Sequence, residues 1–182
     1  MHFISLSFEV NYGCMQEIYL DSFFRKVAFP ILKDHRYQEM KKYVTHGRYT
    51  LFDHCFRVSL LAYSQARRKG LSLNYESLIR GCLLHDYYLY DWHKAHEGHK
   101  FHGFRHPYFS LRNAERDFSL TRKEKNMILS HMFPFTFWIF PKSREAILLT
   151  WADKRCAYQE HHNTFHEARR EEIPLPLERS KA

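Results

Sequence analysis

Apolar residues recur at intervals of three and four along most of the chain, a spacing that predicts helices. The clearest case is segment 51–68, in which Phe52 and Phe56 begin one apolar stripe and further apolar residues fall on a second face. Apolar positions on more than one face predict a buried helix. Gly70 is expected to end it.

The rest of the first half gives weaker helical patterns. Residues 15–35 predict a helix interrupted near Pro30, and residues 36–44 predict a short helix that ends before the glycine at 47. Residues 75–88 predict a helix capped by Ser72 or Asn74, since both side chains can accept from the first-turn amides. Residues 89–105 are rich in His, Gly and aromatic residues and predict a loop.

The second half follows the same logic. Pro107 is expected to open a helix that runs to about Phe118, because proline is tolerated in a first turn. Thr121 with a Glu three residues later predicts a capping box. Residues 134–141 predict an irregular apolar connector, and Ser143 is expected to start a long helix through about residue 170. No segment alternates as a strand does, so the predicted class is all-α.

One domain accounts for the length of 182 residues. We expect a single helical domain over 15–172, an extended tail over 173–182 and a possible disordered extension over 1–14, since Met15 is an equally good start. Glu9 interrupts the apolar N-terminus and no basic stretch precedes it, so no signal peptide is predicted. No apolar run approaches the ~20 residues that a membrane helix needs. A cytoplasmic protein without a membrane partner is therefore expected.

The net charge of +8 favours anionic partners, but an ordinary basic surface gives the same number. The four cysteines form no CxxC pair, and we expect them to be reduced and mostly buried. Cys82 lies three residues before His85, and Cys156 lies three after Asp153. A thiolate ligand is thus conceivable beside the simpler interpretation of small packing residues.

Six ionisable residues fall within or beside apolar helical segments, where an unpaired charge is costly. A single buried histidine usually has an ordinary structural role, but six such groups need a common partner. Imidazoles and carboxylates are good ligands for divalent metals, and a cation removes the cost of burying carboxylates. The six residues are His54, His85, Asp86, His106, His131 and Asp153.

The ordered set His54, His85-Asp86 and Asp153 resembles the H…HD…D signature of the HD-domain metal-dependent phosphohydrolase superfamily, over roughly residues 40–160. The resemblance implies an HD-domain helical bundle, and the lysine after the last aspartate, Lys154, also fits. His106 and His131 resemble the additional histidines of the binuclear branch. That branch implies two divalent ions (Fe, Mn, Ni, Zn or Mg): His54, His85, Asp86 and Asp153 would hold the first, and His106 and His131 the second, with Asp86 bridging.

By this resemblance the chain would hydrolyse a phosphate ester, such as a nucleotide or another small phosphomonoester or phosphodiester, through a metal-activated water. Asp86, Lys154 and His106 would be the catalytic residues. Leu89 stands where some subfamilies have a phosphate-binding lysine, and the GYP signature of cyclic-dinucleotide phosphodiesterases is missing. Substrate contacts must then come from other residues. The candidates are His46, Arg57, Lys94, Arg105 and Lys154. For each of them except Lys154, an exposed surface charge is the alternative interpretation.

Two further histidine groups compete for a role. His93, His96, His99 and His102 recur at every third position and predict a polar loop at the mouth of the site, with a separate metal-binding loop as the alternative. His161, His162 and His166 predict an exposed helix face. His162 and His166 lie one helical turn apart, as in half of a zinc site, but no HExxH glutamate accompanies them.

Two other functions remain open. Some superfamily members with the same six ligands are di-iron oxygenases. A non-catalytic module that binds a nucleotide or nucleic acid is the third hypothesis, although the complete ligand set and the lack of a recognition motif argue against it. The oligomeric state is not indicated.

Overall fold

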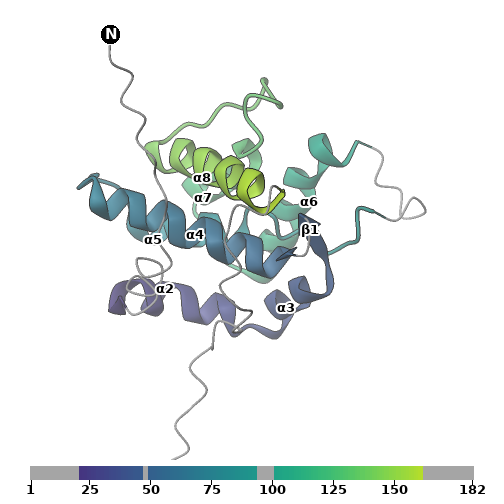
Figure 1. Cartoon of the computed structure of the whole chain (residues 1–182), viewed down its shortest axis with the longest axis horizontal. Coiled ribbons are helices and arrows are strands. Elements are labelled where there is room, and N and C mark those ends of the chain that lie inside the picture. Colours follow the sequence, from purple (N-terminus) through teal and green to yellow (C-terminus); the bar gives the residue numbers. More distant parts are fainter. Residues whose placement is uncertain (1–20, 47–48, 94–100, 162–182) are drawn as a thin grey trace, which may run out of the picture.

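The computed structural model describes residues 21–46, 49–93 and 101–161. Its described part is almost entirely helical, with one short two-stranded sheet (Figure 1). The predicted all-α class is therefore confirmed. In chain order the elements are α2 (Ser22–Leu32), α3 (His35–Gln38), the 3-10 helix η1 (Glu39–Lys42), β1 (Val44–His46), β2 (Tyr49–Thr50), α4 (Leu51–Arg68), α5 (Tyr75–Leu84), α6 (His102–Asp117), α7 (Arg122–Ser130) and α8 (Arg144–His161).

Helix α4 is the centre of the bundle, as its two apolar faces predicted. Thr50 caps it by accepting from the Asp53 amide at 3.2 Å, and Asp53 accepts in return from the Thr50 amide at 3.0 Å, which forms a capping box. The helix ends at Lys69, where Gly70 adopts a left-handed φ of 58°. Figure 1 shows α8 above α4 and α2 with α3 below it.

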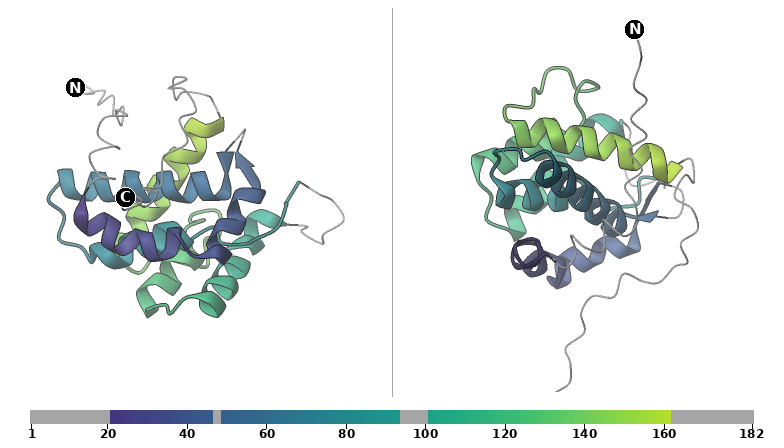
Figure 2. Two further views of the ribbon diagram at one scale, coloured as in Figure 1. Left: turned by 90° about the horizontal axis from the view of Figure 1, so that it is seen from below. Right: turned by 60° about the vertical axis from the view of Figure 1, so that its left-hand side comes forward.

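Helices α5, α7 and α8 complete the core around α4. One apolar cluster joins α2, α4 and α5, and a second joins α4, α5, α7 and α8. Figure 2 shows the same helices from two further sides. In the second cluster Val58, Leu78 and Leu149 are fully buried. Residues from four different helices thus meet around one interior, and polar side chains placed there face one another.

The structure corrects two predicted boundaries in the first half. Helix α2 continues through Pro30 to Leu32, because Pro30 lies in its last turn and removes only one helical hydrogen bond. The segment predicted as one short helix over 36–44 divides into α3, η1 and strand β1. Strand β1 contains two β-branched residues, Val44 and Thr45, which suit a strand.

Two further corrections concern the candidate site. Helix α5 ends at Leu84 rather than near residue 88, so His85 is its C-cap and Asp86 lies in the following turn. Helix α6 begins at His102 rather than at Pro107, so part of the predicted loop over 89–105 is helical. The first correction places His85 at the end of a helix, and the second places His106 inside α6, one turn after its start.

The predicted apolar connector after α7 consists of turns, and in Figure 1 it projects above α8. Four of its aromatic side chains are exposed, while Thr136 is fully buried. The Thr121–Glu124 capping box predicted for α7 is present, with the Glu124 amide donating to Thr121 at 3.2 Å. The exposed aromatic residues are Phe135, Phe137, Trp138 and Phe140.

Among the described residues no helix combines the length and the apolar character needed to cross a bilayer. The predicted extension over 1–14, the tail over 173–182 and the expected end of the last helix near residue 170 lie outside the described residues.

Candidate metal centre

The six histidine and aspartate side chains singled out from the sequence meet in the interior. They come from α4, the C-terminal ends of α5 and α7, α6 and α8. All six are buried, and the most exposed, Asp153, has a relative exposure of 7%. Their donor atoms form three overlapping groups of potential metal ligands: His54, His85 and Asp86; His85, His131 and Asp153; and Asp86, His106 and His131.

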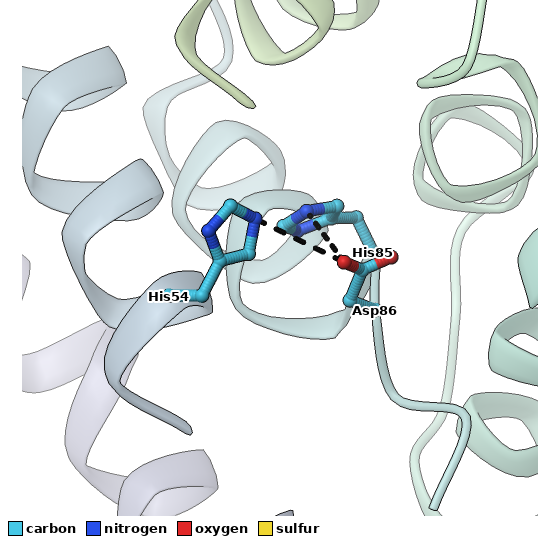
Figure 3. A group of neighbouring side chains, drawn as sticks. All are labelled: His54, His85 and Asp86. Atoms are coloured by element: carbon cyan, nitrogen blue, oxygen red, sulfur yellow. Dashed lines mark ion pairs between the residues drawn. The ribbon is translucent and has the colours of Figure 1, made fainter. Parts of the chain in front are cut away.

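A first group gathers around the two aspartates. His54 Nε2 lies 3.1 Å from Asp153 Oδ1 and 3.8 Å from Asp86 Oδ2. His85 Nε2 lies 3.6 Å from the same two oxygen atoms. Figure 3 shows His54 and His85 directed toward Asp86 from different parts of the fold. We call His54, His85, Asp86 and Asp153 the first group.

A second group lies on the other side of Asp86. Its Oδ1 atom is 3.2 Å from His106 Nε2 and 3.4 Å from His131 Nε2. The two Nε2 atoms are 2.8 Å apart. We call Asp86, His106 and His131 the second group. Each oxygen of the Asp86 carboxylate therefore faces a different pair of imidazoles.

Backbone carbonyls fix the tautomer of three of these histidines. The Nδ1 atoms of His85, His106 and His131 lie 2.8, 3.0 and 2.7 Å from the carbonyls of Cys82, His102 and Ile128. A carbonyl only accepts, so each Nδ1 must carry the proton. In a neutral ring the Nε2 lone pair is then available as a ligand, and all three Nε2 atoms point into the cluster.

Two polar atoms at the centre of the cluster make close ionic contacts but no hydrogen bond within the described part of the chain. His85 Nε2 and Asp86 Oδ1 are buried without a hydrogen bond of acceptable geometry. His106 and His131 bring two Nε2 lone pairs within 2.8 Å, which is repulsive unless a cation or a proton lies between them. The donor set therefore fits divalent metal ions.

The comparison with known families agrees with this geometry. The family model described as HD domain matches residues 51–158, more than half of the chain. The chain belongs to the HD domain family. No curated protein and no solved structure matches it. This HD domain has a helical fold and a buried His/Asp cluster that is consistent with divalent metal binding.

The protonation of the HD domain's cluster follows from burial and charge. Burial acts to lower the pKa of His54, but Glu160 and Asp153 outweigh it and raise that pKa well above its usual value. Burial also acts to lower the pKa of His85, but Cys55 and Asp86 outweigh it and raise that pKa well above its usual value.

The aspartates shift in the opposite direction. Burial acts to raise the pKa of Asp86, yet the charges of His85 and His106 hold it well below its usual range. The pKa of Asp153 is also held well below its usual range, because its bonds to His54 and His85 outweigh burial. Burial lowers the pKa of His131. Both carboxylates therefore stay ionised and available as ligands.

Sequence reasoning missed one member of the site, Glu160. This fully buried carboxylate lies 2.7 Å from His54 Nδ1 through its Oε2 atom. Its Oε1 atom lies 3.1 Å from Arg57 Nε. A signal was present in the sequence, because Glu160 follows Asp153 by seven residues and so lies on the same face of α8, two turns later.

The predicted substrate residues lie in different places. Lys154 is exposed, and its amine donates to the His131 carbonyl at 2.9 Å. Desolvation lowers its pKa, against the opposing effect of Asp153. Arg57 pairs with Glu160, and the exposed Arg105 stacks its guanidinium 5.3 Å from the Phe109 ring centre.

Two predicted substrate residues are not tested by the structure. Lys94 lies outside the described residues, and the same holds for the side chain of His46.

The competing histidine groups are only partly described. His93 is exposed and pairs with Asp91 at 3.2 Å. His102 stacks on His106 at 4.6 Å between ring centres and contacts Tyr90 Oη at 2.9 Å, so it lies beside the second group. His161 is exposed. The remaining histidines of both groups, His96, His99, His162 and His166, lie outside the described residues.

Three of the cysteines are free and buried, as predicted, and the fourth, Cys14, lies outside the described residues. Cys55 Sγ lies 3.7 Å from His85 Nδ1, on the side of the ring that faces away from the cluster centre. No cysteine joins a group of potential metal ligands in the described ranges. A shallow cavity of about 550 Å³ lies along α2, lined by Arg25, Phe29 and Lys33 among others, and shares no residue with the cluster.

Proposed function

We propose that this HD domain is a metal-dependent phosphohydrolase with two divalent ions. The first group would hold one ion and the second group the other, with Asp86 shared. The observation that carries the proposal is the carboxylate of Asp86, whose Oδ1 faces His106 and His131 while its Oδ2 faces His54 and His85. Membership in a family of mostly hydrolases supports the same conclusion.

When bound, divalent ions would supply charge neutralisation for a phosphate ester and would lower the pKa of a coordinated water. The chain's own contribution is to present the ligands in a fixed state. Three Nδ1–H groups are tied to backbone carbonyls, so the Nε2 lone pairs need no reorganisation. Burial of the cluster excludes bulk water from the charges, which strengthens their effect on a phosphate.

Lys154 is the cation that we assign to the substrate. It follows a ligand of the first group on α8, and its amine reaches the backbone carbonyl of a ligand of the second group, His131. An ammonium has three donors, and that bond uses one of them. The other two are available to phosphate oxygens at the exposed edge of the site. A small phosphomonoester or phosphodiester, such as a nucleotide, is the substrate class.

The test combines metal content with hydrolysis. Protein purified without chelator is expected to contain close to two ions per chain by elemental analysis and to release phosphate or nitrophenol from nucleotides, p-nitrophenyl phosphate or bis(p-nitrophenyl) phosphate. Lys154→Met is expected to keep both ions and to lose at least tenfold in kcat/KM, about 1.4 kcal/mol of transition-state stabilisation. Lys125→Met is the matched control, since Lys125 pairs with Glu115 on the surface.

Other outcomes would decide against the proposal. Two iron ions with oxygen consumption and no hydrolysis would identify an oxygenase. No bound metal, even after Mn²⁺ or Fe²⁺ is added to the protein, would leave a non-catalytic binding module.

A further inference from the structure

One histidine of the cluster differs from the other three in what holds its Nδ1 atom. His85, His106 and His131 are held by neutral backbone carbonyls, whereas His54 is held by the carboxylate of Glu160 at 2.7 Å. Glu160 is not one of the signature residues, and it belongs to none of the groups of potential ligands. Its position needs a separate explanation.

Glu160 lies in surroundings where a carboxylate needs partners. The side chain is completely buried, and burying an ionised carboxylate is expensive unless a partner compensates it. Arg57, one helical turn after His54 on α4, supplies that partner at 3.1 Å and is itself only 13% exposed. The Arg57 guanidinium in turn lies 4.5 Å from the Tyr49 ring centre. The ring and the acid thus hold Arg57 in place.

A carboxylate behind a ligating histidine has two physical effects. It fixes the ring with Nε2 directed at the ion, and it raises the basicity of that nitrogen because the Nδ1 proton is partly drawn away. The first group therefore draws on three carboxylates, Asp86, Asp153 and Glu160. In the second group Asp86 is the member carboxylate, and Asp153 approaches only within 4.8 Å of His131. The two halves of the site differ in negative charge.

We propose that Glu160, neutralised by Arg57, is a positioning residue that holds His54 as a ligand and makes the first group the tighter of two metal sites. The inference rests on the proposed binding of metal but not on the reaction that follows. Arg57 then serves Glu160 rather than the substrate. The ion in the second group is the exchangeable one.

The test measures metal affinity on the full chain, with Mn²⁺ as the probe. Protein stripped with EDTA is titrated by calorimetry, and the wild type is expected to show one tight and one weaker site. Glu160→Ala is expected to weaken the tight site by about 10–100-fold, the usual cost of losing such a partner, and to leave the weaker site unchanged. Glu160→Gln keeps an acceptor for Nδ1–H without the charge, so its loss is expected to be smaller.

The matched control is Glu145→Gln. Glu145 is a buried acid at the start of the same helix, paired with Lys123 at 2.7 Å, and it has no contact with the cluster. Its replacement is expected to lower the Tm of the metal-free protein without changing either dissociation constant. If Glu160→Ala does the same as this control, the role of Glu160 is purely structural and the proposal is overturned.

Two further outcomes separate this proposal from the proposed function. If Glu160→Ala fails to fold, the Glu160→Gln and Glu160→Asp variants decide. Wild-type affinity for Mn²⁺ at both metal sites in both of these variants overturns the positioning role. If the wild type binds two ions but hydrolyses no phosphate ester, the proposed function fails while the effect of Glu160 on affinity stands. If the wild type hydrolyses a phosphate ester but Glu160→Ala binds both ions with wild-type affinity, the proposed function stands and the role of Glu160 fails.

Discussion

Replacing Asp86 by Asn is expected to weaken both metal sites, whereas replacing Asp153 by Asn is expected to weaken mainly the first. The reason is geometric. The two oxygens of Asp86 face different histidine pairs, whereas the nearest contacts of Asp153 Oδ1 are to His54 at 3.1 Å and to His85 at 3.6 Å. Asn has the shape of Asp, but it has no charge and only one oxygen, so it can serve only one ion as a ligand.

The magnitude follows from counting the affected ions. Loss of a hydrogen-bond partner behind a ligand costs about 10–100-fold in affinity, and loss of the ligand's charge costs at least as much. Each affected ion therefore loses at least about 1.4–2.7 kcal/mol of binding free energy. Asp86→Asn, which affects two ions, should lose about 3–5 kcal/mol, or about twice the loss in Asp153→Asn.

Thermal unfolding with and without metal measures this difference. For a chain of 182 residues, 1 kcal/mol shifts the Tm by about 2–4 °C. Metal-induced stabilisation should fall by about 6–20 °C in Asp86→Asn and by about 3–10 °C in Asp153→Asn. Elemental analysis after gel filtration should show fewer ions in the Asp86 variant. Equal losses in the two variants, or two retained ions in Asp86→Asn, would refute the bridging role.

Three further predictions concern pH, a helix cap and a buried hydroxyl. The pKa values of His54 and His85 are raised in the folded, metal-free protein. The resulting stabilisation is complete below about pH 6.5 and is lost as the pH rises through the raised values. The Tm of the metal-free protein should therefore fall above about pH 6.5, while stabilisation by Mn²⁺ grows. A metal-free Tm that is flat across this range would contradict the ion pairing. Thr121→Ala removes the cap of α7 and should cost about 1 kcal/mol in unfolding experiments without changing metal content; a lost ion would show that the cap also supports the site. Tyr37→Phe leaves the Leu83 carbonyl without its donor at 2.7 Å and should cost about 1–3 kcal/mol in denaturant unfolding; an unchanged midpoint would mean that water replaces the hydroxyl.

The sequence predicted the members of the cluster because charge among apolar residues is conspicuous. His54 lies between Phe52 and Phe56 in a helix that is apolar on two faces, and such a group needs a partner. The apolar pattern alone could not predict that these residues, which lie on five different helices, meet in one place. The resemblance to the HD signature supplied that arrangement before the structure showed it.

Two features of the site lay beyond sequence reasoning. Helix α5 was predicted to continue past the His-Asp pair because Tyr87 and Tyr88 extend the apolar pattern, and both are indeed buried, but in the segment after the helix. Glu160 precedes a histidine-rich stretch that suggests an exposed surface, so its burial was not evident. The carbonyls that hold each Nδ1 are backbone groups, and no residue type marks them.

The ends of α5 and α7 have a consequence for the energetics of ion binding. His85 and His131 are the C-caps of these helices, and each ring bonds to a carbonyl that would otherwise lack a partner. Each helix dipole therefore directs its negative end, equivalent to about half an elementary charge, toward the cluster. Together the two helix ends act on the cluster roughly as one negative elementary charge, in addition to the charges of the carboxylates.

The proposed ions would stabilise more than their ligands, because they would fix the last turns of α5 and α7, two helices that already pack together through contacts such as Arg80 with Glu124 at 3.0 Å. Backbone amides of residues 82–88 and 128–133 should therefore exchange with deuterium more slowly when metal is bound, while those at the start of α5 and α7 stay unchanged. Binding of the proposed ions would therefore tighten the junction between the C-terminal ends of α5 and α7.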